Sequence, residues 1–385
     1  MFKRPPFVLE RGNGAYLFDL DANRYLDFVS GIGVNAFGYG DSDMVEAITE
    51  QAQQLIHCSN LYYSVPSVQL ARVLVENSFA DKAFFGNSGS EAVEGAIKFA
   101  RKWGSTKFSP PKHEIITMSH SFHGRTYGAL SATGQTKYHK GFEPMVPGFR
   151  TVEFGDLNAV REAITEQTCA VMIEPLQGEG GAYVAGKEYL EGLRALCNEK
   201  SVLLISDEIQ CGLGRLGRLF AYEYSGIEPD IVTLAKPLGG GLPIGAILLK
   251  DEIAECLGPG DHGTTFGANP VACALALKVL EKMLADGFLE GVRQKGAYMH
   301  QELHKLMKAH PDEILEIRGA VMLAGVVTTR APKEYVKAFQ ERGILVCVTG
   351  SDAVRLIPPY VIKMRHIDDM IEVFGDILMQ WEKDQ

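Results

Sequence analysis

Two stretches of the chain decide the fold: 202-VLLISDEIQ-210 and 231-IVTLAKPLGGG-241. Each starts with a short apolar run of strand length and ends in polar residues. The 29-residue interval from Asp207 to Lys236 is about one strand–helix–strand unit, which predicts neighbouring strands that deliver both side chains to one edge of a sheet. In open α/β sheets that edge is where ligands bind.

More short apolar runs lie along the chain and extend this sheet. Helical or loop segments separate them, as in a mostly parallel sheet that is covered on both faces. The predicted strands are 83–85, 114–118, 170–173, 202–206 and 231–234, and a helix is predicted for 91–103. The sequence therefore predicts an α/β fold in which polar residues gather after the carboxyl ends of the strands.

Both ends of the chain predict a second, smaller domain. Residues 15–28 alternate apolar and polar side chains around a central turn, which predicts a β-hairpin. Beyond residue 287 the pattern predicts a helix, several strands and a final helix from His366. We therefore expect 1–42 and 287–385 to form a small α+β domain and 43–286 to form the large domain.

Composition and charge restrict the class of function. The 385 residues are 46% hydrophobic and 22% charged, which fits a globular protein with a large core. A net charge of -10 leaves no broad basic surface for nucleic acid or membrane lipid, so we expect a small-molecule substrate. Seven scattered cysteines, without metal-ligand spacing, fit a reducing compartment and no metal site. We expect a cytoplasmic protein, or one of an organelle matrix or stroma if a transit peptide has been removed.

Lys236 and Asp207 together favour binding of a phosphorylated pyridine aldehyde, pyridoxal 5'-phosphate (PLP). A lysine at the buried end of a strand is costly as an ammonium ion, and condensation with an aldehyde removes that cost. Asp207 can keep the ring nitrogen protonated through a charge-assisted bond worth roughly 1.5–3 kcal/mol, and Gln210 can donate to the ring hydroxyl. The other interpretations are a surface lysine in a turn and an aspartate that caps a helix.

The stretch Asn87–Ala92, NSGSEA, is a candidate phosphate-binding turn. Free amides at a helix start, together with the helix dipole, favour an anion by up to ~2 kcal/mol. Ser88 and Glu91 also match a capping box, so these residues alone fit a well-capped helix, and both interpretations can hold at once. In 121-SFHGRT-126, Phe122 is a candidate to stack on the ring and Arg125 to clamp a carboxylate, with a core and a structural role as the alternatives.

Ten strings cover nearly the whole chain in this order: SGIGVNAFGYG, SNLYYS, FFGNSGSEA, IKFARK, SFHGRT, EPLQGEGG, SDEIQCGLGR, LAKPLGGGLPIGA, HGTTFGANP and VRLIPPY. They resemble the class III aminotransferases, and within them the acetylornithine aminotransferases of arginine biosynthesis. The resemblance implies a fold-type-I PLP-dependent transferase with a seven-stranded sheet in its large domain. It also implies a homodimer whose active sites are shared between subunits.

The resemblance further implies roles for single residues. Around the cofactor, Lys236 is the Schiff-base lysine, Asp207 the partner of the pyridinium nitrogen, Gln210 the contact of the ring hydroxyl, Phe122 the stacking ring, Gly89 and Ser90 the phosphate ligands, and Thr265 a phosphate ligand from the partner subunit. Around the substrates, Arg125 binds the α-carboxylate of the donor, Arg355 receives the α-carboxylate of glutamate, Glu179 masks Arg355 when the other substrate is bound, and Asn60 and Tyr62 lie on a nearby loop.

Three positions depart from the family's common pattern. Pro237 follows the lysine where glycine is usual, Ala268 replaces the second glycine of a TFGGNP string, and Ser90 stands where alanine or threonine is common. Ser90 keeps its backbone amide, so phosphate binding is expected to survive. Ala268 requires a negative φ to be free of strain.

These residues predict a two-stage transamination. The δ-amino group of N2-acetylornithine would pass to 2-oxoglutarate, giving N-acetylglutamate 5-semialdehyde and glutamate, with Lys236 as general base and acid. Succinylornithine, ornithine, 4-aminobutyrate and carrier-bound lysine stay open as donors. A PLP aminomutase or decarboxylase would need no second acceptor, and a catalytically silent PLP-binding protein is the alternative that is not an enzyme.

Overall fold

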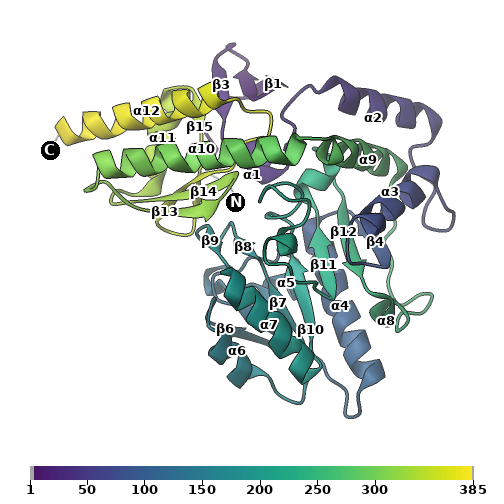
Figure 1. The fold of residues 1–385 in the computed structure, drawn as a ribbon. Helices are drawn as coiled ribbons and strands as arrows, with labels where there is room; N and C mark the ends of the chain where they lie inside the picture. Colours follow the sequence, from purple (N-terminus) through teal and green to yellow (C-terminus); the bar gives the residue numbers. More distant parts are fainter. Residues whose placement is uncertain (1–3, 384–385) are drawn as a thin grey trace.

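The computed structural model describes residues 4–383 and is built around a seven-stranded sheet (Figure 1). Its strands, in spatial order, are β4 (Lys82–Gly86), β12 (Gly245–Leu249), β11 (Ile231–Leu234), β10 (Leu203–Asp207), β7 (Thr168–Ile173), β5 (Glu114–Met118) and β6 (Phe149–Val152). Only β12 runs antiparallel to its neighbours. The predicted α/β class and mostly parallel sheet are confirmed.

Alternate residues of the central strands pack into cores on opposite faces of this sheet. Leu203 and Ile205 of β10 belong to the core under α4 (Gly89–Lys107), whereas Leu204 lies in the core under α7 (Lys187–Lys200). Because side chains alternate along a strand, burial on both faces requires a continuous apolar run. This explains why the sequence signal for these strands is strong.

Shorter elements surround the sheet. Around it lie α6 (Leu157–Ala163), α5 (Tyr127–Ala132), α8 (Asp251–Ala254), the hairpin of β8 (Leu176–Gln177) and β9 (Tyr183–Val184), and 3-10 turns at Thr136–Tyr138, Ala221–Tyr224 and Lys236–Gly239. To one side, α2 (Ser42–Gln54) and α3 (Val65–Glu76) both pack against α9 (Pro270–Leu284) (Figure 1). None of the helices in residues 4–383 is long and apolar enough to span a membrane.

The two ends of the chain come together in an α+β part of the fold. One sheet has the order β1 (Leu9–Asn13), β2 (Tyr16–Asp19), β3 (Arg24–Asp27) and β15 (Ile344–Leu345), so the first and last parts of the chain share it. A second has the order β13 (Ile314–Ala320), β14 (Leu323–Thr328), β17 (Ala353–Leu356) and β16 (Cys347–Thr349). Helices α10 (Phe288–Ala309), α11 (Pro332–Glu341) and α12 (Met364–Lys383) lie with them at one end of the molecule (Figure 1). The predicted hairpin at 15–28 is confirmed, and the boundaries at 42 and 286 stay predictions.

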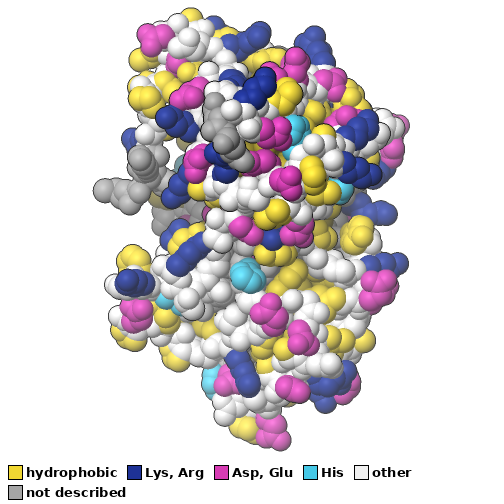
Figure 2. Space-filling view, turned by 90° about the vertical axis from the view of Figure 1, so that its left-hand side faces the viewer, with side chains coloured by type: hydrophobic (Ala, Val, Ile, Leu, Met, Phe, Trp, Pro, Cys, Tyr) yellow, Lys and Arg dark blue, Asp and Glu magenta, His cyan; other side chains and the backbone are white. Residues whose placement is uncertain are grey.

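Charged side chains of both signs are interspersed on the face shown in Figure 2, which carries no continuous basic patch. This agrees, for that face, with the acidic net charge of the sequence. A surface of this kind does not concentrate polyanions.

Candidate active site

A cavity of about 380 Å³ opens at the carboxyl ends of β10 and β11, within the size range of small-molecule sites. It brings together seven of the residues predicted from the sequence: Gly89, Ser90, Phe122, Glu179, Asp207, Gln210 and Lys236. The register of the sheet places Asp207 of β10 opposite Thr233 of β11, three residues before Lys236. Neighbouring parallel strands therefore deliver the carboxylate and the amine to one site, as the spacing predicted.

Lys236 points a poorly solvated amine into this cavity. Burial lowers its pKa to about 8, and the nearby charge of Arg355 adds to the effect. Within residues 4–383 the amine has no hydrogen bond or ion pair, and the residue adopts a strained φ of 40° immediately before Pro237. An amine of this kind, partly neutral near neutral pH, suits condensation with an aldehyde.

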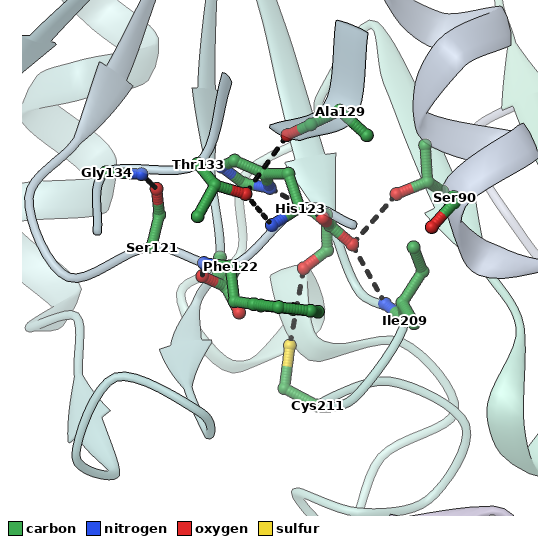
Figure 3. A network of polar contacts seen from close by, with 12 residues as sticks. Ser90, Ser121, Phe122, His123, Ala129, Thr133, Gly134, Ile209 and Cys211 are labelled. Carbon is green, nitrogen blue, oxygen red and sulfur yellow. Dashed lines mark hydrogen bonds and ion pairs between the residues drawn. The ribbon is translucent and has the colours of Figure 1, made fainter. Parts of the chain in front are cut away.

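Asp207 is held by three donors from three different segments. His123 Nδ1 lies 2.7 Å from one carboxylate oxygen, while Thr233 Oγ1 and the Ile209 backbone N–H donate to the other at 3.0 and 3.2 Å. Figure 3 shows His123 with Thr133 on one side and Ile209 on the other. Thr133 Oγ1 accepts from the His123 backbone N–H at 2.9 Å, so the histidine is fixed in turn. The carboxylate is thus oriented before any ligand arrives.

The start of α4 presents free amides to the cavity. The Ser88 hydroxyl accepts from the Glu91 N–H at 3.2 Å, and Glu91 accepts from the Asn87 N–H at 2.7 Å, one residue further out than in a capping box. In the described chain, the N–H groups of Gly89 and Ser90 have no acceptor. Amides at a helix N-terminus, free and beside Lys236 and Asp207, fit the phosphate of the expected cofactor.

One wall of the cavity contains a buried acid that the sequence analysis missed. Glu174 accepts from the Phe122 backbone N–H at 2.8 Å, which fixes the loop that carries the predicted stacking ring. Burial, with the nearby charge of Asp207, raises the pKa of Glu174 well above its usual range. Glu174 comes directly after β7, so the argument that polar residues at the carboxyl ends of strands are candidate site residues applies to it as it does to Asp207. His123 gave no such signal, because it lies in a loop and contacts Asp207 across 84 residues of sequence.

Arg355 and Glu179 form an ion pair at the edge of the cavity. Arg355 Nη1 lies 2.8 Å from a carboxylate oxygen of Glu179, and it also donates to the Gly178 carbonyl at 2.8 Å. The arginine is 2% exposed and the glutamate 29%, so the glutamate is the partner that can move towards solvent. The structure thus brings together the pair that the resemblance implied, although the masking role stays a prediction.

Besides Arg355, four predicted residues do not line the cavity of this chain. Arg125 is exposed and stacks its guanidinium over the Tyr138 ring, 4.0 Å from its centroid. Thr265 and Tyr62 are also exposed. Asn60 donates to the Thr264 carbonyl at 2.8 Å, which joins the two loops on which these residues lie. Their roles stay predictions.

Comparison with known proteins identifies the family. The model described as "Aminotransferase class-III" matches residues 2–378. The chain is 48% identical to the acetylornithine aminotransferase of Methanocaldococcus jannaschii, covering 100% of this chain and 96% of the relative. It is 47% identical to the acetylornithine aminotransferase of Caldanaerobacter subterraneus subsp. tengcongensis, with 98% and 96% covered.

The chain belongs to the class-III aminotransferases. Among solved structures it is similar to the ornithine aminotransferase of Toxoplasma gondii crystallized with oxidized glutathione, which has PLP at partial occupancy in its active site. The TM-score is 0.95 at 32% identity, covering 100% of this chain and 93% of the other.

The structure shows the backbone or hydrogen-bond environment of two residues, Ala268 and Ser90, that depart from the common pattern of class-III aminotransferases. Ala268 has a φ of 57°, in the left-handed region, so alanine is strained here where the family commonly has glycine. The Ser90 hydroxyl accepts from the Arg125 backbone N–H at 3.2 Å, which leaves its own amide free. The expectation that Ser90 preserves the phosphate turn therefore agrees with the geometry, whereas Ala268 carries a local cost.

Proposed function

We propose that this class-III aminotransferase binds PLP and transfers the δ-amino group of N2-acetylornithine to 2-oxoglutarate. The observation that carries the proposal is the cavity in which Lys236, Asp207 and the free amides of α4 converge beside the Arg355–Glu179 pair. The names of the two curated relatives support the choice of donor. When bound, PLP supplies an aldehyde that exchanges amines and a ring that withdraws electrons.

The residues of the chain transfer the proton and orient the cofactor. Lys236, with its pKa lowered to about 8, can take a proton from the carbon that carries the amine and return it at the next step. Asp207, fixed by His123, would hold the ring nitrogen, and the free amides of Gly89 and Ser90 would hold the phosphate.

The ion pair offers a way to accept two chemically different substrates. The δ-carbon of acetylornithine, which carries the reacting amine, bears no carboxylate and leaves Glu179 on Arg355. 2-Oxoglutarate carries an α-carboxylate on its reacting carbon, and this carboxylate replaces Glu179 on the same arginine. One pocket can therefore serve both stages.

An absorbance titration of the purified protein tests the cofactor, the donor and the acceptor. Acetylornithine added without acceptor should remove the absorbance of the bound cofactor aldehyde, and 2-oxoglutarate should restore it. Lys236→Ala should lose both that absorbance and turnover. A spectrum that does not respond to acetylornithine would contradict the proposal.

Related donors are the second candidate, because a structural neighbour is an ornithine aminotransferase. Comparison of kcat/KM for acetylornithine, ornithine, succinylornithine and 4-aminobutyrate decides between them. A preference for free ornithine would refute the proposed donor. Turnover without 2-oxoglutarate would instead indicate an aminomutase or decarboxylase.

We also propose a homodimer with shared active sites. Large apolar side chains are exposed on the segment 55–68 and on the neighbouring loop, with Leu61 at 83%, Tyr63 at 95% and Phe266 at 62% exposure. Clusters of this kind mark interaction surfaces. A second copy that covers them would receive Thr265 and Asn60 near its own cavity. Light scattering tests the dimer, and a monomer at micromolar concentration would refute it.

The cytoplasmic location, with an organelle matrix or stroma as the alternative, stays part of the proposal. All seven cysteines are free in the structure, which supports a reducing compartment. Cell fractionation with an antibody against the chain tests it.

A further inference from the structure

Arg355 is held on two edges of its guanidinium by different kinds of contact. Nη1 donates to the Gly178 carbonyl and to Glu179, both at 2.8 Å, and lies 3.4 Å from Gln210 Oε1. Nε donates to Cys347 Sγ at 3.3 Å. Among the described residues, Nη2 has no hydrogen-bond partner. One edge of the guanidinium thus faces the movable Glu179, and another faces a thiol.

The backbone sets the position of that thiol. Cys347 lies on β16 directly opposite Arg355 on β17, in an antiparallel pair of strands. Side chains of directly opposed residues lie on the same face and contact each other. Cys347 also packs against the buried cluster that contains Leu176, Leu323 and Ile357. The sulfur is therefore a fixed acceptor for Nε.

The same strand and its turn also fix the loop that carries Glu179. Thr349 Oγ1 donates to the Gly178 carbonyl at 2.7 Å, and the Gly350 N–H donates to the Glu179 carbonyl at 3.1 Å. These contacts hold the backbone of the loop and leave the Glu179 side chain free to turn. The β16 segment therefore supports both members of the ion pair, and among the described residues Cys347 supplies its hydrogen bond to the guanidinium.

Geometry restricts how a carboxylate can bind this guanidinium. Two-pronged binding uses either Nη1 with Nη2 or Nε with Nη2. Cys347 Sγ occupies the Nε side, so a carboxylate that replaces Glu179 finds Nη1 and Nη2. We propose that Cys347 is a positioning residue that keeps Arg355 in this orientation while the α-carboxylate of 2-oxoglutarate is bound. This inference rests on the proposed function.

The effect should appear in one stage of the reaction only. During the donor stage Glu179 holds Nη1, so the guanidinium keeps its orientation without the thiol. During the acceptor stage Glu179 has left, and the remaining side-chain contacts are Cys347 and the long contact to Gln210. Loss of the sulfur should therefore weaken the acceptor and spare the donor.

Four variants test the inference on the holoenzyme. Cys347→Ala and Cys347→Val remove the acceptor, and valine fills the space of the thiol. Cys347→Ser keeps a hydroxyl that accepts from Nε. Cys256→Ala is the control, because Cys256 lies near α8, and among the described residues its thiol donates one hydrogen bond, to the Glu252 carbonyl at 3.4 Å.

We expect KM for 2-oxoglutarate to rise on the order of fivefold in both the alanine and valine variants. KM for acetylornithine and the rate of the donor stage should stay at the wild-type value, serine should restore most of the acceptor affinity, and the control should match wild type. An unchanged KM for 2-oxoglutarate, a parallel rise for both substrates, or a serine variant as weak as alanine would overturn the inference. A wild-type enzyme that does not use 2-oxoglutarate would instead overturn the proposed function.

Discussion

Replacing Glu179 with glutamine should make 2-oxoglutarate bind more tightly. The acceptor must displace Glu179 from Arg355, so the free energy of that ion pair is subtracted from the binding free energy of the acceptor. The pair is 2.8 Å long, with one partner 2% exposed and the other 29%. Exposed pairs contribute ~0–1 kcal/mol, whereas removing one partner of a buried pair costs about 3–5 kcal/mol, so we assign this partly exposed pair about 1–2 kcal/mol. That range corresponds to roughly 5- to 30-fold in affinity, and the amide, which still accepts a hydrogen bond, favours the lower end.

Steady-state kinetics with each substrate varied in turn measures this effect. KM for 2-oxoglutarate should fall about fivefold, and KM for acetylornithine should rise, because an unmasked Arg355 attracts the carboxylate of the donor. Glu191→Gln is a matched control, since Glu191 pairs with Lys187 at 3.8 Å on the exposed surface of α7. An unchanged or higher KM for 2-oxoglutarate would refute the competition between Glu179 and the acceptor.

Three further predictions follow from the geometry and charges of the site. Lys236 has a pKa of about 8 in the folded chain against an ordinary value of 10.5, so the rate at which PLP recombines with the apoprotein should rise with pH and level off above about 8. Between pH 8 and 10.5 the Lys236 amine is protonated in the unfolded chain and mostly neutral in the folded one, so the free energy of unfolding of the apoprotein should increase with pH over that range. A recombination rate and a stability that both stay constant with pH would contradict the lowered pKa. Ala268→Gly should relieve a left-handed φ and stabilise the fold by a net ~0.5 kcal/mol in denaturant titrations, and a lower midpoint would argue against strain. His123→Leu removes a buried donor to Asp207 and should weaken PLP affinity about tenfold or more, as measured by equilibrium titration, whereas an unchanged affinity would mean that the contact does not support the cofactor.

The sequence predicts the strands that carry Asp207 and Lys236 because both faces of those strands are buried. It does not predict β6, which has the sequence FRTV and lies at the edge of the sheet, because that strand is half-exposed and shows no apolar run. It also misses β12, although its residues GAILL are buried. Glycines and prolines precede this strand, and its antiparallel direction depends on a tertiary pairing with β4 and β11 that local periodicity does not encode.

The site also contains residues that local sequence pattern reveals and residues that only tertiary pairing brings into place. Asp207 is recognisable because it ends an apolar run, and Glu174, at the end of β7, follows the same rule. His123 is different, because it contacts Asp207 across 84 residues of sequence, and only the fold brings the two together. The Cys347 contact with Arg355 likewise depends on strand register, because a slip of one residue would turn the Cys347 side chain to the other face of the sheet. Strand-end residues can be predicted from pattern, whereas their partners require the register and packing of the whole sheet.

The predicted residues that lie outside the cavity are best explained by the exposed apolar surface around them. Asn60 and Thr265 lie on loops joined by the Asn60–Thr264 hydrogen bond, and the same loops expose Leu61, Tyr63 and Phe266. Burying each of these large side chains contributes about 1.5–3 kcal/mol, so a second copy placed on this surface would gain several kcal/mol before any polar contact forms. If the proposed dimer places Thr265 beside the partner's phosphate site, association and cofactor binding are linked, and each strengthens the other. Thr265→Ala, which leaves the apolar surface intact, should then lower PLP affinity without a comparable loss of dimer, and the two measurements together separate the contact from the association.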